Sequence, residues 1–506
     1  MQLSHTRPVG CARFDEANLV SCAGLVPVVA LAERAGLRRL ADAHLSVPTD
    51  KGANAGLKVA SLVAGMVAGA DSIDDLALLR HGGMGRVFSN AYAPSTLGSF
   101  LRTFTFGHVR QLDAVASRLL GGLAARTPLL TGLADPAERV LVDIDDTIIE
   151  VHGYAKQGAG FGYSGVRGLN ALLGTVSTAQ TAPVIVAQRL RKGSCGSPRG
   201  AKRLVADALK VLDNLRAAQG PAQGPAQGPA QDPGQRPGQR PGQRPGRPAG
   251  APLAPLVRMD SAFYGRAAVG AAIRAGAEVS VTVRLDPAVK TAIAGIAEHA
   301  WQTINYTDAV FDADTGRWIS RAELAETPFT AFTSGKVVER VTGRLVVRRI
   351  PELNPNGQDS LFNQWRFHAF FTTTSPTDLD TVTADKTHRR HAVIEQVHAD
   401  LKNSALAHLP SGVFTANAAW LVLAVMAFNL TRAAATLTSR CSGQSLAKAT
   451  TGSVRRKIIH LPARIASSAR RLTLHLPTGW PWQSAWTELF TQLLTQPGRP
   501  PPAAAT

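Results

Sequence analysis

The sequence predicts an α/β fold in which a helical region comes first and a strand–helix core with a β-rich insert follows. Residues 15–125 carry apolar residues at three- and four-residue spacing, the pattern of amphipathic helices. From residue 138 onward, strand-like and helix-like segments alternate, as in a sheet covered by helices. Residues 302–375 instead form successive strand-like segments. Together these three patterns define the predicted fold class.

Composition and charge narrow the kind of partner. The chain has 506 residues, enough for roughly two to four domains, and its 45% apolar content is that of a globular protein. It carries 55 Lys and Arg residues against 36 Asp and Glu residues, a net charge of +19. Such an excess favours a polyanionic partner. Composition alone leaves DNA, RNA and a membrane surface open.

Cysteines and apolar runs exclude several other classes. The four cysteines are scattered and form no C-x-x-C pair, which disfavours a disulfide framework or a zinc finger and fits a reducing, intracellular compartment. Residues 1–14 lack the apolar core of a secretory signal. The most apolar stretch, 416–430, is short for a membrane span and contains Asn417 and Asn429. It is predicted to be a buried helix.

Three amphipathic segments make up the predicted helical region. They begin at Leu25 (LVPVVALAERAGLRRLADAHL), Leu57 (LKVASLVAGMVAG) and Pro94 (PSTLGSFLRTFTFGHVRQLDAVASRLL). The third opens with the Pro-Ser-Thr signal of a helix N-terminus. Short helices with basic faces suit a DNA-binding module, although solvated surface helices carry the same pattern.

The core is predicted from strands and helices on both sides of a repeat. ERVLVDIDDTIIEVHGY and PVIVAQRL (from Pro183) have strand patterns, and GAKRLVADALKVLDNL (from Gly200) has a helix pattern. After the repeat, PLVRMDSAFYG is a strand that ends at Asp260, followed by a helix and the strand AEVSVTVRL. The repeat runs from about Ala217 to Gly250 as GPAQ and then GQRP units. Its Pro and Gly content predicts a solvated linker.

The predicted boundaries divide the chain into seven segments. They are a helical DNA-binding region (1–130), the first part of the core (131–216), a disordered Pro/Gly repeat linker (217–250), the second part of the core (251–300), the β-rich insert (301–380), core helices with a candidate catalytic glutamate (381–440) and a basic C-terminal tail (441–506).

Carboxylates at the ends of predicted strands form the candidate site. Asp145 lies at the exit of one apolar strand and Asp260 at the end of another, where open α/β sheets place ligand sites. Asp143 shares the face of Asp145, whereas Asp146 points the other way, because strand side chains alternate. Phosphoryl transfer with two divalent ions about 4 Å apart needs few protein carboxylates. Asp143 and Asp145 both remain candidates for the first ligand, although the spacing to Thr147 favours Asp145.

The third candidate carboxylate is Glu395, in the predicted helix THRRHAVIEQVHADLK. Polar residues follow one stripe of this helix at steps of three, four, three and four. They are His388, His391, Glu395, His398 and Lys402. Cations one turn either side of a metal-binding Glu could grip a DNA phosphate, but an ordinary solvated face has the same pattern. Zinc binding by the three histidines is disfavoured, because their spacing matches no standard zinc motif.

These motifs resemble the DDE transposases of bacterial insertion sequences, in the branch with a β-rich insert before the glutamate. That branch carries the signature Y-(2)-R-(3)-E-(6)-K, which Glu395 and Lys402 match in spacing. His388 and His391 stand at the Tyr and Arg positions, with Arg389 and Arg390 beside them. The motifs VDIDDT, HG-x-x-K-x-G-x-x-x-G-Y (152–163), PSTLGSFLR and the HLP and LPARI segments of the tail are similar to the thirteen-eighty insertion-sequence group. The resemblance covers nearly all of the chain except the repeat.

The resemblance implies an RNase H-like catalytic core in a bacterial, cytoplasmic and nucleoid-associated enzyme. It implies cleavage at terminal inverted repeats and joining of the ends to target DNA, carried out by a homodimer on double-stranded DNA, with no membrane involved. Asp145, Asp260 and Glu395 are then the catalytic residues and the ligands of two Mg²⁺ ions, with Mn²⁺ as a possible substitute. Other side chains would contact DNA. These are Lys402, Arg389, Arg390, His388 and His391, with Trp301 and Trp318 as candidates for stacking on a flipped base, and the basic tail around Arg455, Arg456, Lys457, Arg470 and Arg471.

Two other interpretations compete with this one. The motif from Asp143 to Thr147 also matches the D-x-D-x-T of haloacid-dehalogenase-like phosphatases, in which Asp143 would be the nucleophile and Asp145 a general acid. The nearest later acidic cluster, TDLDTVTAD, lacks the glycine of that family. A catalytically inactive DNA-binding relic of a transposase is the other alternative. His388 and His391 favour the relic, and the retained carboxylates argue against it.

Overall fold

The computed structural model describes residues 11–48, 50–88, 90–219, 253–312, 317–351, 365–438, 445–468 and 471–494. The side chains of residues 219, 305–321 and 351 are outside this description. The repeat linker predicted at 217–250 lies almost wholly outside the described residues.

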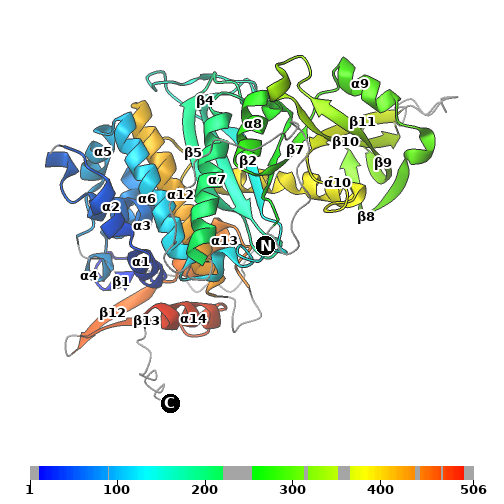
Figure 1. The fold of residues 1–506 in the computed structure, drawn as a ribbon. Coiled ribbons are helices and arrows are strands. Elements are labelled where there is room, and N and C mark those ends of the chain that lie inside the picture. Colours follow the sequence, from blue (N-terminus) through cyan, green and yellow to red (C-terminus); the bar gives the residue numbers. More distant parts are fainter. Residues whose placement is uncertain are drawn as a thin grey trace, which may run out of the picture.

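Helices form the N-terminal part of the molecule, drawn in blue and cyan in Figure 1. Their bounds are α1 Leu25–Arg34, α2 Leu37–His44, α3 Ala55–Ala68, α4 Met84–Val87, α5 Pro94–Arg102 and α6 Phe106–Ala124. The amphipathic segment that begins at Leu25 is divided into α1 and α2 at Gly36. Gly36 has a φ of 91°, which glycine adopts without the steric cost that a side chain would bring.

A mixed sheet of ten strands crosses the centre of the molecule. Six of its strands are β2 Leu141–Glu150, β3 Gly160–Phe161, β4 Arg167–Ser177, β5 Val184–Lys192, β6 Leu256–Met259 and β7 Glu278–Thr282. The order is β3-β4-β2-β6-β7-β11-β10-β9-β8, and β5 also pairs with β4. β6 runs parallel to β2 and β7, whereas β4 is antiparallel to β2 and β5. This large mixed sheet in an α/β chain is consistent with an RNase H-like core.

Four antiparallel strands extend the sheet within the segment predicted as the β-rich insert. They are β8 Gln302–Asp312, β9 Arg317–Ala331, β10 Val341–Pro351 and β11 Trp365–Thr372. β11 pairs with β7 through Phe371 and Val281, and β10, β9 and β8 follow in turn. These strands therefore continue the main sheet and do not form a separate one (Figure 1).

The helices after β5 include elements that pack against the sheet and the segment that carries Glu395. α7 Ala201–Gln219 contacts β4, β5 and α8 Arg266–Arg274, and α9 Pro287–Ala294 follows β7. After β11 come α10 Thr381–Arg389, the 3₁₀ turn η7 Arg390–Ala392 and α11 Val393–Lys402. α11 packs against β2, so the chain brings the segment of Glu395 back to the strand of Asp145.

The long helix α12 Phe414–Thr436 joins the N-terminal helices to the sheet. It contacts α3 and α6 of the N-terminal region and also β5 of the sheet. Its length and composition would allow it to cross a membrane, but its apolar window is 100% buried inside the structure. The predicted buried helix is confirmed. Its polar Asn429 donates to the carbonyl of Ile185 (2.8 Å) and accepts from the N–H of the same residue (3.0 Å).

The two ends of the described chain meet in a small sheet. β1 Leu19–Val20 pairs with β12 Ala463–Ser468, which pairs with β13 Arg471–His475. α13 Thr451–Val454 and the π-helical turn η8 Arg455–Ile459 precede this sheet, and α14 Gln483–Leu494 packs against α1. The segment RRKII of the predicted basic tail is helical, and Arg470 of that tail lies outside the described residues.

Candidate functional site

Asp145 and Asp260 lie at the point where two parallel strands stop pairing. The last pair of the β2–β6 ladder is Ile144 with Met259, so Asp145 and Asp260 are the next residues on adjacent strands. The sequence predicts a strand pattern over ERVLVDIDDTIIEVHGY but places Asp145 at the exit of an apolar strand. In the structure β2 extends to Glu150, because β4 pairs with it along its whole length. Asp145 is therefore a mid-strand residue that lies at the end of the parallel ladder.

The two carboxylates act on each other electrostatically. Burial raises the pKa of Asp260 above its usual value, and the negative charge of Asp145 raises it further. Asp260 also begins the 3₁₀ turn η4 Ser261–Phe263, where its Oδ1 accepts from the N–H of Ala262 at 3.0 Å. That hydrogen bond lowers the pKa without cancelling the effect of burial. Two carboxylates in one another's field are suited to binding a metal ion.

Asp143 has a different role, although it shares the face of Asp145. Its side chain is fully buried and receives two hydrogen bonds of 2.7 Å from the guanidinium of Arg258. The Nδ1 of His391 lies 3.0 Å from its Oδ1. Burial opposes the ionisation of Asp143, but Arg258 and His391 outweigh it and hold the pKa below its usual value. Asp143 is thus enclosed in an ion pair, which favours Asp145 as the accessible carboxylate of β2.

Asp146 points to the opposite face of β2, as the alternation of the strand predicts. It forms an ion pair with Arg191 of β5 and accepts hydrogen bonds from Asn170 (2.6 Å) and Ser197 (2.9 Å). Asp143 and Asp146 are therefore both neutralised by arginines. Among the described residues, the ion-pair contact found for Asp145 is with a histidine, His398, at 3.4 Å.

Glu395 lies between two histidines that reach the aspartates of β2. His391 contacts Asp143, and His398 lies 3.4 Å from Oδ2 of Asp145. His398, three residues after Glu395 on α11, shares a helical face with it, whereas His391 lies in the 3₁₀ turn η7. Glu395 is exposed, and no three His, Cys, Asp or Glu side chains among the described residues are close enough to hold one metal ion. The structure therefore brings Asp145 and Asp260 together but leaves Glu395 at the edge of the site.

The sequence places His398 on the polar stripe with Glu395 but does not predict its contact with Asp145. The His398 side chain is buried, and neither ring nitrogen has a hydrogen-bond partner within the described structure. An unpaired buried imidazole is costly. The Nε2 of His398 lies 3.4 Å from Oδ2 of Asp145, so the ring faces the carboxylate of the candidate site.

The residues predicted to contact DNA divide into two groups. His388 stacks on Phe370 with ring centroids 4.2 Å apart, and its two nitrogens lie 2.8 Å and 2.9 Å from the hydroxyls of Ser280 and Thr282. Burial lowers the pKa of His388 to about 3, so the ring is neutral at physiological pH. Its surroundings favour a structural role over contact with a phosphate.

The cations of this segment are placed differently from His388. Arg389 donates to Asp385 at 2.8 Å, and Arg390 is exposed on η7. Lys402 ends α11, and burial lowers its pKa. It lines a cavity of about 340 Å³ that begins beside Thr147. Arg390 and Lys402 therefore remain available for the predicted DNA contact.

Of the two tryptophans predicted to stack on a base, only Trp301 has a described side chain. The guanidinium of Arg349 lies 4.2 Å from the centre of the Trp301 ring and 4.3 Å from that of Trp365. One face of the Trp301 ring is therefore already covered by a cation. The side chain of Trp318 is outside the described residues, and its role remains a prediction.

Tyr163 lies in the electrostatic field of three carboxylates, which the sequence does not predict. Partial burial and the charges of Asp146, Asp145 and Asp260 raise its pKa. Its residue is still 75% exposed, and it lines the same cavity as Lys402. Tyr163 comes from the glycine-rich loop between β2 and β4, and the position of this loop directly after the strand of Asp145 is the signal that could have identified it.

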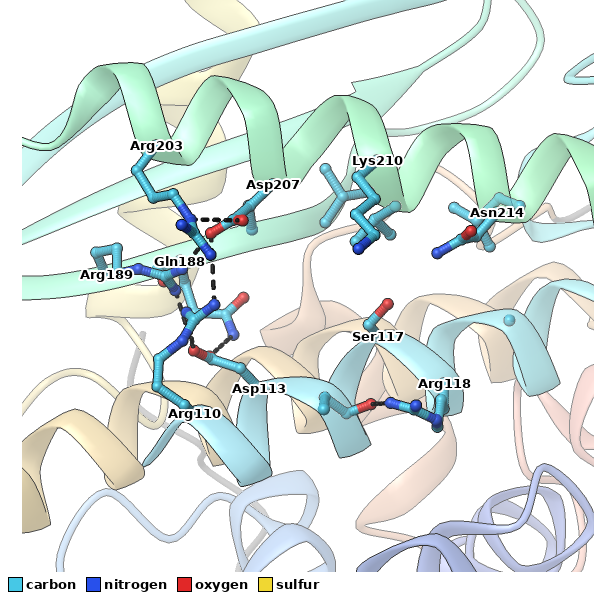
Figure 2. A pocket seen from close by; sticks show the side chains of 16 residues that line it. Arg110, Asp113, Ser117, Arg118, Gln188, Arg189, Arg203, Asp207, Lys210 and Asn214 are labelled. Atoms are coloured by element: carbon cyan, nitrogen blue, oxygen red, sulfur yellow. Dashed lines mark hydrogen bonds and ion pairs between the residues drawn. The ribbon is translucent and has the colours of Figure 1, made fainter. Parts of the chain in front are cut away.

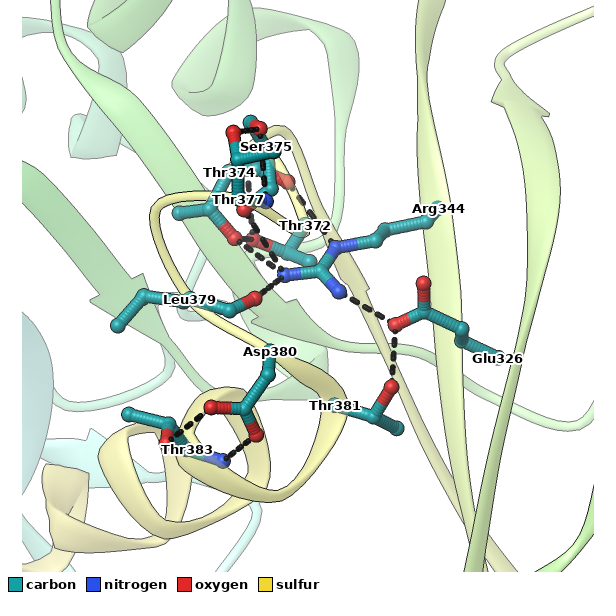
Figure 3. Close-up of polar contacts among 10 residues, drawn as sticks. All are labelled: Glu326, Arg344, Thr372, Thr374, Ser375, Thr377, Leu379, Asp380, Thr381 and Thr383. Atoms are coloured by element: carbon teal, nitrogen blue, oxygen red, sulfur yellow. Dashed lines mark hydrogen bonds and ion pairs between the residues drawn. The ribbon is translucent and has the colours of Figure 1, made fainter.

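A buried arginine fixes the segment that leads to Glu395. In Figure 3, Arg344 of β10 points into the turn between β11 and α10 and binds Thr374 at its carbonyl (3.0 Å) and hydroxyl (3.1 Å). It also donates to the carbonyl of Leu379 and pairs with Glu326 of β9. Asp380 then begins α10 by accepting from the N–H of Thr383 at 2.9 Å. These contacts tie the start of the α10–α11 segment to the extended sheet.

The comparison with known families gives one match. Residues 251–497 match the model described as Transposase DDE domain group 1, a range that contains Asp260, Glu395 and Lys402. No curated protein matches the chain. Residues 251–497 of the chain therefore carry a DDE-type transposase domain.

Proposed function

We propose that the protein is a DNA transposase that cuts at the terminal inverted repeats of its element and joins the ends to target DNA. Asp145, Asp260 and Glu395 are the proposed catalytic residues. The observation that carries this proposal is the adjacency of Asp145 and Asp260 beyond the last pair of the β2–β6 ladder, with the charge of Asp145 raising the pKa of Asp260. The proposal of a double-stranded DNA substrate is supported by the transposase domain and by the net charge of +19.

Asp145, Asp260 and Glu395 would hold two Mg²⁺ ions, with Mn²⁺ as a substitute. Asp143 and Asp146 are each neutralised by a buried arginine, whereas Asp145 and Asp260 raise the local negative charge. The ring of His398 faces the carboxylate of Asp145. When bound, such ions activate an attacking hydroxyl and stabilise the leaving oxygen.

The protein's own residues would position the substrate around this site. Glu395 would complete the ligand set when DNA or metal draws α11 toward β2, since its flanking histidines already contact Asp143 and Asp145. Lys402 and Arg390 would hold the phosphate of the transposon end. A homodimer on DNA in the bacterial cytoplasm, associated with the nucleoid, is the setting that we propose for this chemistry.

The surroundings of Asp143 argue against the haloacid-dehalogenase-like phosphatase alternative, in which Asp143 would be the nucleophile. In that mechanism Asp143 would attack a phosphorus atom, but its side chain is fully buried and held by Arg258 at both oxygens. An inactive DNA-binding relic is the alternative that the experiment must separate. The observation in favour of the relic concerns His388, at the Tyr position of the signature. Its ring already contacts Ser280, Thr282 and Phe370, so it is not free to contact a phosphate.

The proposal is tested by cleavage of a labelled duplex that carries the terminal repeats of the element. Wild type and Glu395→Gln are compared in Mg²⁺ and in EDTA, with Glu33→Gln, an exposed glutamate on α1, as the matched control. We expect cleavage at the repeat boundary in Mg²⁺ for wild type and the control. Glu395→Gln should bind the duplex without cleaving it. Binding without cleavage by the wild type would instead identify an inactive relic.

A further inference from the structure

A charged groove lies between α6 and α7, away from the carboxylates described above. Its volume is about 520 Å³, and Figure 2 shows polar side chains of α6, α7 and β5 pointing into it. Five of the residues that line it are cationic, and two are acidic. The cations are Arg110, Arg118, Arg189, Arg203 and Lys210.

The two carboxylates are shared among three arginines at one end of the groove. Asp113 of α6 pairs with Arg110 (2.6 Å) and with Arg189 of β5 (3.0 Å). Asp207 of α7 pairs with Arg110 (3.6 Å), Arg189 and Arg203 (3.1 Å). Three positive charges thus meet two negative charges. This network fastens α6 to α7 and retains one positive charge.

The other end of the groove holds two cations outside this network. Lys210 of α7 and Arg118 of α6 are exposed on opposite sides of the groove, with Asn214 on α7 and Ser117 on α6 beside them (Figure 2). Arg118 donates to the backbone carbonyl of Ala114 at 3.0 Å. Within the described residues, no carboxylate forms an ion pair with Arg118 or Lys210. The groove therefore carries three positive charges beyond its two carboxylates.

Sheet register relates this groove to the proposed catalytic site. Asp145 pairs with Leu173 of β4, and Leu173 pairs with Gln188 of β5. Gln188 lines the groove and donates to Asp113 at 2.6 Å. Adjacent strands are about 4.8 Å apart, so the groove begins about 10 Å from the strand of Asp145. That separation is smaller than the width of a DNA duplex.

We propose that this groove binds the phosphodiester backbone of double-stranded DNA, as a second contact beside the catalytic site. The surplus cations Arg118 and Lys210 hold phosphates, while Ser117 and Asn214 offer further donors. The ion-paired arginines keep the two helices at a fixed separation. This inference rests on the proposed function, because it assigns another part of the same DNA substrate to a site of its own.

The test is DNA binding by the full chain with Arg118 and Lys210 both changed to Gln. Each phosphate contact contributes about 0.9 to the slope of log affinity against log salt. We expect the double variant to reduce that slope by about 2 and to weaken binding to a labelled duplex at least about tenfold at moderate salt. The double variant that conserves both charges, Arg118→Lys with Lys210→Arg, should retain binding.

The matched control is Arg126→Gln with Lys202→Gln. Arg126 is exposed and donates to Gly122 as Arg118 does to Ala114, and Lys202 is exposed on α7 but does not line the groove. An equal loss of slope in this control would overturn the assignment and indicate only general charge attraction. Unchanged binding by Arg118→Gln with Lys210→Gln would overturn it as well. Cleavage at saturating DNA should persist in the groove variant, whereas failure of wild-type cleavage would count against the proposed function alone.

Discussion

Asp143 and Asp145 are two residues apart on the same face of β2, but their surroundings differ. We expect Asp143 to stabilise the fold and Asp145 to act in cleavage. Asp143 is paired with Arg258, whose side chain is 1% exposed. Asp143→Asn would leave that guanidinium without its counter-charge, and breaking a buried pair typically costs about 3–5 kcal/mol. We expect this loss in urea unfolding. Asp145→Asn should change unfolding little and abolish Mg²⁺-dependent cleavage. An Asp145→Asn protein that still cleaves DNA would contradict the assignment.

Tyr163 offers a second prediction at the scale of one side chain. Its exposed ring lies in the field of three carboxylates and lines a cavity with Lys402. An aromatic ring in this place can stack on a base of the bound end, a contact worth about 1–3 kcal/mol. Tyr163→Ala should therefore slow cleavage of saturating DNA roughly tenfold, and Tyr163→Phe should not. Tyr154→Ala, an exposed tyrosine in the same loop, is the control. Equal slowing by Tyr163→Phe would show that the hydroxyl acts instead.

At the scale of elements, the α10–η7–α11 segment is held through His388. The folded protein lowers its pKa to about 3, from an ordinary value of about 6.5. The unfolded chain therefore binds the proton first, so the free energy of unfolding is highest above about pH 6.5 and falls as the pH decreases toward about 3. The slope from this group is at most about 1.4 kcal/mol per pH unit.

Urea unfolding at several pH values measures this contribution. His388→Gln should have a smaller slope between about pH 6.5 and about pH 3 than wild type. His299→Gln, at an exposed position, should leave the slope unchanged. A wild-type slope in His388→Gln would mean that His388 titrates in the folded protein as it does in the unfolded one.

The sequence predicts some elements well and others poorly, for physical reasons. The parallel strands before Asp145 and Asp260 are short apolar runs that end in an acid, and both are present as β2 and β6. β4, by contrast, is buried on both faces over Gly168–Ser177. It therefore lacks the alternation that marks a half-buried strand. Without β4, the sequence could not show that Asp145 lies within a paired strand and not at the exit of one.

The candidate site shows the same limit. Helical periodicity alone puts His391, Glu395 and His398 on one stripe. The contacts of these histidines with Asp143 and Asp145 depend on how α11 packs against β2. The burial of His388 between β7 and β11 residues depends on tertiary packing as well. The sequence pattern of this stripe fits either a solvated helix face or a phosphate-binding face. Only the long-range contacts in the structure show that its residues have different surroundings.

At the scale of the whole molecule, α12 connects two parts of the chain that are far apart in sequence. It packs against α3 and α6 of the N-terminal region and against β5 of the main sheet. Asn429 makes the polar part of this connection by pairing with both backbone groups of Ile185. Because both partners share one buried helix, we expect the N-terminal helices and the sheet to unfold in a single transition.

Asn429→Ala tests this coupling, since it leaves the N–H and the carbonyl of Ile185 unpaired in the core. Each unpaired buried group costs about 1–3 kcal/mol, so the free energy of unfolding should fall by roughly 2–6 kcal/mol. Hydrogen exchange should report the same loss for amides of α3 and of β5, because one helix stabilises both. Asn403→Ala, at an exposed asparagine after α11, should change neither. Loss of protection in β5 alone, with α3 unaffected, would mean that the helical region is stable without the sheet and that α12 does not couple them.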